Sequence, residues 1–73
     1  MTKPQILRLN DADNIVVAIA DLPSGTPVEG AVRALRPIPR GHKVASKPIA
    51  QGAPVRKFGQ IIGFASTDIA PGG

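Results

Sequence analysis

Glycine and proline are spread so densely along this chain that they limit the secondary structure it can form. Eight of each occur among its 73 residues, and after Leu22 no stretch free of both is longer than seven residues. Proline removes a backbone donor and glycine loses more entropy on folding, so both oppose the interior of a helix. The sequence therefore predicts no ordinary α-helix after Leu22 and an all-β fold of short strands.

A recurring pattern accounts for the corners between these strands. An apolar anchor is followed by two turn residues and a glycine, and an apolar or β-branched residue comes shortly afterwards. Glycine accepts the positive φ that such turns require. Three copies and the start of a fourth are present: Leu22–Val28, Ile38–Val44, Ile49–Val55 and Ile69–Gly73. Their anchors are 16, 11 and 20 residues apart, which is too uneven for a solenoid built on a fixed period.

The segments between the corners have the composition of β-strands. Gln5–Leu9 and Ile15–Ala20 are expected to form a first hairpin across the polar turn 10–14. Ile15–Ala20 is continuously apolar and β-branched, which predicts a fully buried strand. The later predicted strands are Gly41–Ala45, Val55–Phe58, Gln60–Ser66 and Ala31–Leu35, the last of which could also form a single helical turn. Gly59 and Gly63 indicate bends or bulges in the last pair. We therefore predict a compact β fold that bends on itself.

The length and composition restrict the class of protein further. Residues 1–73 make one domain, near the lower size at which a chain can bury a sufficient core, so a partner would add stability. Without cysteine there is neither a disulfide framework nor a thiolate zinc site. One histidine and five carboxylates predict no metal site within the chain. No signal peptide or membrane span is predicted, so the expected location is the cytoplasm.

Positive charge is concentrated in one part of the chain. Ala31–Thr67 contains seven cations and no carboxylate. Such a segment could attract an anion, for example a sugar acid, a phosphate, a nucleic acid or an acidic protein face. It could equally be a solvated β surface on which Lys and Arg protect strand edges. Only two phenylalanines are available for stacking, so binding of single-stranded nucleic acid has little support.

Three segments in order carry a family resemblance: Asp13–Ala18, Gly41–Ala45 and Val55–Ala65. Together with the corners between them, they resemble the SAF domain of the altronate/galactarate dehydratase family over nearly the whole chain. Ala20–Leu22 and Pro48–Gly52 are more similar to the altronate type. The resemblance implies a β-clip, a long hairpin folded over on itself. The family usually has tyrosine where this chain has Phe58, so a role for that hydroxyl is not carried over.

The resemblance also implies a function and partners. The expected protein is a hydro-lyase acting on a sugar acid, with divalent iron or manganese in the full enzyme and most catalytic groups in a larger domain. This chain would be the N-terminal domain or small subunit of that enzyme, inactive alone, with a homodimer as one arrangement. Two alternatives stay open: a non-enzymatic assembly or docking module, and the small subunit of a sulfolactate sulfo-lyase.

Four residues are candidates for the site. His42 is the catalytic candidate, because imidazole titrates near neutral pH and could protonate or bind a substrate hydroxyl. The alternative is a ring that bonds a backbone carbonyl and fixes the corner. Lys43, Arg56 and Lys57 are the substrate-binding candidates, since each could pair with a sugar-acid carboxylate. Each could also be an ordinary surface cation.

Overall fold

The computed structural model describes residues 5–73, so the first four residues of the predicted domain lie outside the described residues. Within that range the regular structure consists of short β-strands, and no helix long and apolar enough to cross a membrane occurs there. The strands are β1 (Ile6–Leu7), β2 (Ile15–Ala18), β3 (Pro27–Glu29), β4 (Val32–Arg33), β5 (Lys43–Ala45), β6 (Pro54–Lys57) and β7 (Gln60–Phe64). The predicted all-β class is confirmed.

The centre of the molecule is an antiparallel sheet with the order β1-β2-β5. Val16 pairs with Val44 on one side of β2, and Val17 pairs with Leu7 on the other. The predicted first hairpin is therefore confirmed. The prediction that the strand stays buried as far as Ala20 is wrong, because β2 ends at Ala18 and Ile19 is 42% exposed. Beyond Ala18 the chain turns toward its first corner, and a side chain there is no longer covered from both sides.

Each face of the central sheet packs against a separate hydrophobic cluster. Because side chains alternate along a strand, β2 directs Val16 and Ala18 into one cluster and Ile15 and Val17 toward the other. The first cluster contains Val16, Ala18, Leu22, Val28, Ala34, Ile38 and Val44. The second contains Ile15, Ala45, Ile49 and Ala65, with Val17, Ala53, Val55 and Ile69 packed against it. Burial on two faces explains why β2 is continuously apolar.

The four predicted corners pair through their apolar anchors. Leu22 and Ile38 exchange two backbone hydrogen bonds of 2.8 Å, and Ile49 and Ile69 exchange bonds of 2.9 and 2.8 Å. The corner glycines have φ between 83° and 89°: Gly25, Gly41, Gly52 and Gly72. Positive φ at the third position of a turn is the signature of type II geometry. The predicted role of the glycines is confirmed.

A buried alanine four residues before each anchor completes an eight-residue unit, Ala-x-x-x-anchor-x-x-Gly. In each paired set, the glycine N–H of one unit donates to the alanine carbonyl of the other, at 2.7 or 2.8 Å. The donor–acceptor pairs are Gly25 with Ala34, Gly41 with Ala18, Gly52 with Ala65, and Gly72 with Ala45. The fold thus contains two reciprocal pairs of units, one on each face of the central sheet. We call these four units the corner framework.

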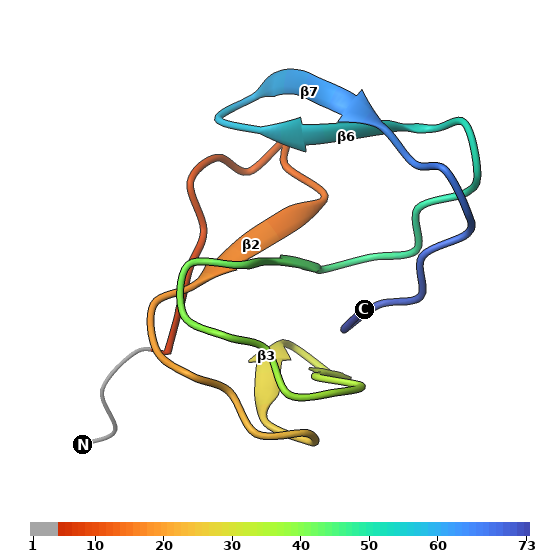
Figure 1. Ribbon diagram of the computed structural model, residues 1–73. Helices are drawn as coiled ribbons and strands as arrows, with labels where there is room; N and C mark the ends of the chain where they lie inside the picture. Colours follow the sequence, from red (N-terminus) through yellow and green to blue (C-terminus); the bar gives the residue numbers. More distant parts are fainter. Residues whose placement is uncertain (1–4) are drawn as a thin grey trace.

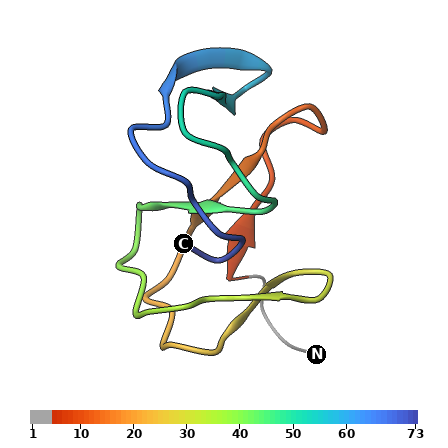
Figure 2. The ribbon, with the colours of Figure 1, turned by 90° about the vertical axis from the view of Figure 1, so that its right-hand side faces the viewer.

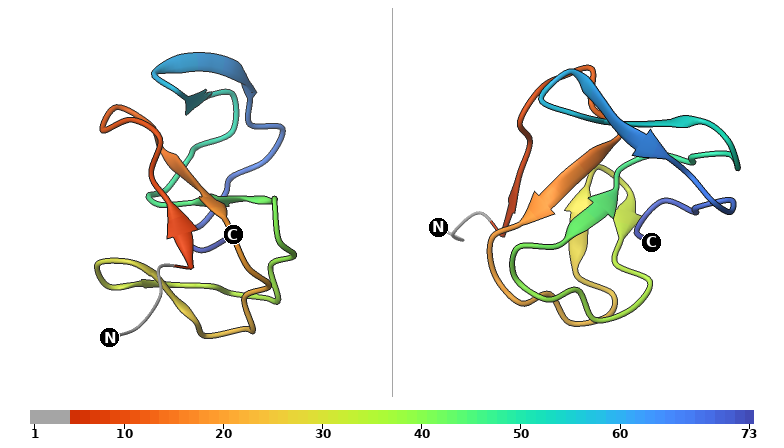
Figure 3. Two further views of the ribbon diagram at one scale, coloured as in Figure 1. Left: turned by 90° about the vertical axis from the view of Figure 1, so that its left-hand side faces the viewer. Right: turned by 45° about the horizontal axis from the view of Figure 1, so that its top comes forward.

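The β6–β7 hairpin lies at one end of the molecule, and β3–β4 lies at the other, with the central sheet between them (Figures 1 and 2). The pairing of β6 with β7 shifts register between Arg56, which faces Ile61, and Val55, which faces Gly63. Ile62 is therefore the extra residue of a β-bulge. Seen with this end of the molecule brought forward, β7 crosses in front of β6 (Figure 3). The irregularity predicted from Gly59 and Gly63 is confirmed.

Candidate functional site

A cavity of about 340 Å³ opens over the second hydrophobic cluster. Its floor is apolar, and its polar lining consists of Arg36, Lys43 and Thr67. No Asp or Glu side chain lines it. The full lining is Ile15, Arg36, Lys43, Ala45, Ile49, Val55, Thr67, Ile69 and Gly73. We call this cavity the basic groove.

Local sequence explains how the two cations reach the groove. Lys43 and Ala45 are two residues apart in β5, so both side chains lie on the face that packs on the second cluster. Arg36 lies in the unit that leads to the Ile38 anchor. The single ion pair within residues 5–73 joins Arg8 to Glu29, so neither Arg36 nor Lys43 forms an ion pair within that range.

This donor set suits one end of a small organic anion. A guanidinium presents a planar fork that matches a carboxylate, and an ammonium adds a point charge. The Thr67 hydroxyl can donate to or accept from a substrate hydroxyl. All three side chains are exposed, so solvent partly screens their charge contacts. The groove can therefore bind a carboxylate, but it holds no acid/base pair of its own.

Two carboxylates of the corner framework accept hydrogen bonds from backbone N–H groups. Asp21 accepts the N–H of Arg40 at 2.9 Å, and Asp68 accepts that of Gln51 at 2.8 Å, each bracing the corner paired with its own. Among residues 5–73 no group of three His, Cys, Asp or Glu side chains is arranged to hold a metal ion. The described residues therefore do not fit divalent iron or manganese, and such an ion would need ligands from another part of an enzyme.

His42 lies at the second corner, where its backbone N–H and carbonyl form hydrogen bonds that hold the turn. Its N–H donates to Pro39 at 3.1 Å and its carbonyl accepts from Ala18 at 2.9 Å. The side chain is exposed, and in the described part of the chain no hydrogen bond involves the ring. The equivalent positions of the other corners hold Thr26, Ala53 and Gly73. The fold at this corner thus does not depend on an imidazole, contrary to the alternative in which the ring fixes the turn.

The other predicted site residues are divided between two places. Lys43 lines the basic groove, whereas His42, Arg56 and Lys57 do not. Arg56 and Lys57 belong to β6, and the Lys57 ammonium lies 6.0 Å from the centre of the Phe58 ring. Sequence reasoning did not select Arg36 and Thr67 as site residues. The available signal was their position beside corner anchors in the segment without carboxylates.

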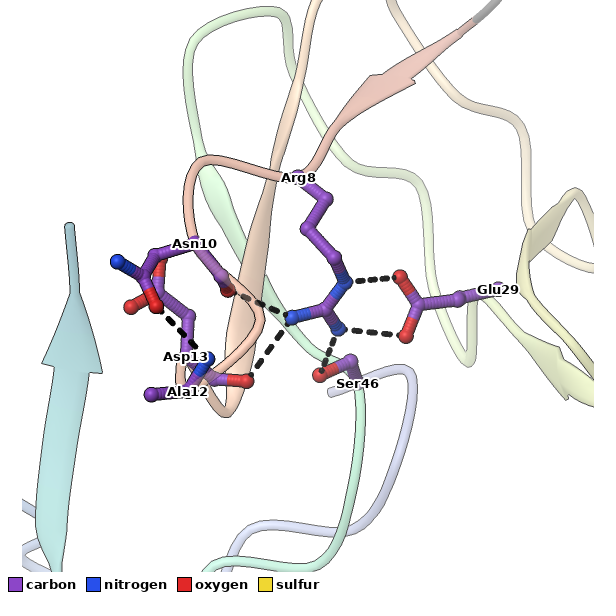
Figure 4. A network of polar contacts seen from close by, with 6 residues as sticks. All are labelled: Arg8, Asn10, Ala12, Asp13, Glu29 and Ser46. Atoms are coloured by element: carbon purple, nitrogen blue, oxygen red, sulfur yellow. Dashed lines mark hydrogen bonds and ion pairs between the residues drawn. The ribbon is translucent and has the colours of Figure 1, made fainter. Parts of the chain in front are cut away.

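A polar network fastens the first loop to the rest of the fold (Figure 4). The Arg8 guanidinium donates to both carboxylate oxygens of Glu29, at 2.6 and 2.5 Å. It also donates to the carbonyls of Asn10 and Asp13 and to the Ser46 hydroxyl. The hydrogen bond from Arg8 lowers the pKa of Glu29 and raises that of Arg8. The geometry indicates a structural role for this pair.

The same loop clamps the β6–β7 hairpin. Asp13 is fully buried, and its carboxylate accepts the N–H groups of Phe58 at 2.9 Å and Gly59 at 2.7 Å. Asn14 donates to the Pro54 carbonyl and accepts from the Arg56 N–H, both at 2.8 Å. Two adjacent polar side chains therefore fix both the turn and one strand of the hairpin. We call Asp13 and Asn14 the hairpin clamp.

Comparison with known proteins places the whole described chain in one family. Residues 4–73 match the altronate/galactarate dehydratase SAF domain. Altronate dehydratase of Escherichia coli (strain K12) is 44% identical over 71 residues, which is 93% of this chain and 14% of that protein. Galactarate dehydratase (L-threo-forming) of the same strain is 31% identical over 68 residues, covering 90% and 13%. Altronate dehydratase of Bacillus subtilis (strain 168) is 30% identical over 69 residues, covering 90% and 14%.

The chain thus spans about 14% of the length of the altronate dehydratases that it matches. The family match extends over almost all of the chain, and it includes every corner unit and the hairpin clamp. The short strands and paired corners agree with the β-clip expected for such a domain. This chain belongs to the altronate/galactarate dehydratase SAF-domain family.

Proposed function

We propose that this chain serves a sugar-acid hydro-lyase of the altronate dehydratase type. Its basic groove completes the binding site for the carboxylate of an anionic hydroxy acid, beside a larger catalytic domain. The observation that carries the proposal is the placement of two cations without an ion-pair partner, Arg36 and Lys43, in one largely apolar cavity that no Asp or Glu side chain lines. The similarity to altronate and galactarate dehydratases supports the substrate class.

The proposed division of labour follows from what the chain lacks. Dehydration of a hydroxy acid needs a base at the carbon beside the carboxylate and an acid for the departing hydroxyl. The described residues offer no metal cluster, and most of their carboxylates are engaged by backbone N–H groups or by Arg8. The chain alone is therefore expected to give no turnover of altronate or galactarate above a metal-only blank. The metal and the base belong to the catalytic domain in this proposal.

His42 is the proposed proton carrier contributed by this chain. It directly precedes Lys43, its ring is exposed, and the corner needs only its backbone. Because the ring makes no hydrogen bond in the described part of the chain, it can face a substrate hydroxyl at a boundary between domains. Arg56 and Lys57 are proposed to contribute charge from the hairpin rather than direct substrate contacts, because neither lines the groove.

The test is an NMR titration of the chain with altronate, compared with altritol, the sugar alcohol that keeps the hydroxyls and lacks the carboxylate. We expect altronate to shift the amides around residues 36, 43–45 and 67–69, and altritol to leave them in place. The double variant Arg36→Gln/Lys43→Gln should lose the shifts. The control Arg56→Gln/Lys57→Gln removes the same charge from the hairpin and should keep them.

Two outcomes overturn the groove proposal. One is an equal response of both double variants, which would assign binding to overall charge. The other is an equal response to altronate and altritol, which would remove the carboxylate from recognition. A response to 3-sulfolactate but not to altronate would replace the substrate with that of the sulfo-lyase alternative.

A further inference from the structure

The β6–β7 hairpin carries most of the exposed apolar bulk of the described chain. Seven large hydrophobic side chains are exposed within residues 5–73, and four of them belong to this hairpin. They are Phe58 at 62%, Ile61 at 50%, Ile62 at 48% and Phe64 at 68% exposure. Both phenylalanines of the chain are among them. Exposed apolar side chains gathered on one small element of a soluble domain indicate an interaction surface. We call these four residues the hairpin patch.

The bulge in β7 contributes to the patch. Along a regular strand, neighbouring side chains lie on opposite faces, so one of two adjacent isoleucines would ordinarily turn inward. Ile62 is the extra residue at the register shift, and a bulge re-aims the side chains around it. Ile61 and Ile62 are consequently both about half exposed. The backbone irregularity thus places apolar surface outside the core instead of inside it.

The turn of the hairpin also places an apolar side chain outside the core. Phe58 has φ of 57°, in the left-handed region where a side chain is disfavoured and where Asn, Asp or Gly is usual in a two-residue hairpin turn. A non-glycine residue held there is strained. Its ring gains little within the chain, because it is 62% exposed. The backbone is held in place by the buried Asp13 carboxylate, which accepts both N–H groups of the turn.

The hairpin is therefore a rigid element with apolar side chains presented outward. The clamp fixes its turn and β6 through four hydrogen bonds, so little order would have to be gained on contact. An element ordered before binding loses less conformational entropy on binding. The hairpin lies at one end of the molecule (Figures 1 and 3), and the four side chains of the patch are exposed.

Charge on the hairpin identifies the chemistry of the partner. Arg56 and Lys57 are adjacent in β6, the Lys57 ammonium is near the Phe58 ring, and residues 54–67 contain no carboxylate. A fitting surface is an apolar recess with carboxylates at its rim. A second copy of this chain fits poorly, because a two-fold contact through the hairpin would bring the same cations together.

We propose that the hairpin patch docks into an apolar, carboxylate-rimmed recess on the catalytic domain of the dehydratase. This inference rests on the proposed function, since it takes the catalytic domain as the neighbour. The similar altronate dehydratases extend far beyond the 14% of their length that this chain matches, so a partner of ample size exists in such enzymes. Docking through the hairpin would hold the basic groove in a fixed position relative to the catalytic groups.

The experiment uses an exchange enzyme, in which this chain replaces the matched segment of the E. coli altronate dehydratase. Amide hydrogen exchange of residues 58–64 is measured in the isolated chain and in the exchange enzyme. We expect exchange to slow by at least about tenfold in the enzyme, since a docked surface opens less often. Ile62→Lys should abolish that protection. Leu7→Lys is the matched control, because Leu7 and Ile62 are both 48% exposed, and it should leave the protection intact.

Each remaining outcome decides the proposal. Equal exchange of residues 58–64 in the chain and in the enzyme overturns it, and so does an equal loss of protection in the two lysine variants. Phe64→Ala, a milder change in the same patch, should weaken the protection if Ile62→Lys prevents folding. An isolated chain that sediments as a dimer, and becomes a monomer with Ile62→Lys, would assign the patch to self-association and overturn docking. The groove variant Arg36→Gln/Lys43→Gln should keep hairpin protection, so a failed groove and a failed docking surface give different results.

Discussion

The corner framework and the β6–β7 hairpin are held in place by different kinds of contact. The corners rely on backbone hydrogen bonds, buried alanines and apolar anchors that pack on the central sheet. The hairpin relies on Asp13 and Asn14, while its largest apolar side chains stay outside. Apolar burial inside the chain thus stabilises the corners, whereas the hairpin patch is left for contacts beyond it. Substitutions in the two regions should therefore have separable effects on stability.

The largest expected effect comes from a charge placed in the framework. Val16 is fully buried between the β-sheet and the first cluster. Val16→Asp buries a carboxylate without a partner and should lower the free energy of unfolding by more than about 3 kcal/mol. Val17→Asp should cost less, because that side chain is only half-buried. Chemical denaturation of the two variants measures the difference, and equal losses would show that the two faces of β2 are assigned wrongly.

A smaller effect, confined to the hairpin, is expected for Asp13→Asn. The carboxylate accepts two N–H groups, whereas an amide offers one oxygen and turns a donor toward the second N–H. One hydrogen bond is lost at a buried site, which costs about 1–3 kcal/mol. Amide exchange should rise in residues 54–64 and stay slow at the corners. Asp21→Asn is the control, since Asp21 is exposed and accepts a single N–H. If the corners loosened as much as the hairpin, the two regions would not be separable.

The corner framework was the part of the fold most open to sequence analysis. An anchor, its glycine and the turn between them lie within four residues, so the conformational demand is local and leaves a pattern. Which anchors pair was not predictable, because Leu22 meets Ile38 and Ile49 meets Ile69 through contacts that no local pattern encodes. The alanine of each unit was missed for a related reason. Its small side chain matters only once the partner corner lies against it.

The candidate site was predicted less completely than the fold. The acid-free segment drew attention to Lys43, which lines the groove, but its neighbours there are fixed by tertiary packing. Arg36 and Thr67 come from corner units of different pairs, so their proximity depends on how the two pairs are placed about the central sheet. Asp13 is a similar case. It was expected in a simple turn, yet its carboxylate meets Phe58 and Gly59, which lie far along the chain.

A modest and pH-dependent effect is expected at the Arg8–Glu29 pair. Hydrogen bonding to Arg8 lowers the pKa of Glu29 in the folded state. The ionised form is therefore favoured by folding, so the pair stabilises the protein above the ordinary pKa of glutamate, about 4.3. This contribution is lost as the pH falls through the lowered pKa. The Glu29 side chain is 37% exposed, so solvent screening limits the contribution to less than about 1 kcal/mol.

Thermal melts of the parent and Glu29→Gln should accordingly differ most near neutral pH and converge in acid. High salt should reduce the difference at neutral pH, because the pair is partly solvated. A gap between parent and variant that widens as the pH falls would contradict the assigned sign. Since Glu29 is the last residue of β3, at the end of the molecule opposite the hairpin, the hairpin's amide exchange should not respond.

The smallest expected effect on stability is at His42. Its ring makes no hydrogen bond in the described part of the chain, and two equivalent corners form with alanine and glycine at that position. His42→Gln and His42→Ala should therefore change the free energy of unfolding by less than about 0.5 kcal/mol. A larger loss would return the ring to a structural role at the corner.

Turnover by the exchange enzyme tests whether His42 acts at the substrate. If the ring moves a proton at the substrate, both variants should lower kcat by roughly 10²–10⁴-fold, because a positioned acid or base contributes that much. Glutamine can still donate and accept hydrogen bonds but does not titrate near neutral pH. A His42→Gln enzyme with full turnover and an unchanged melting temperature would therefore exclude proton transfer by His42. Loss of kcat at constant stability would assign the ring to the site, because the backbone alone maintains the corner.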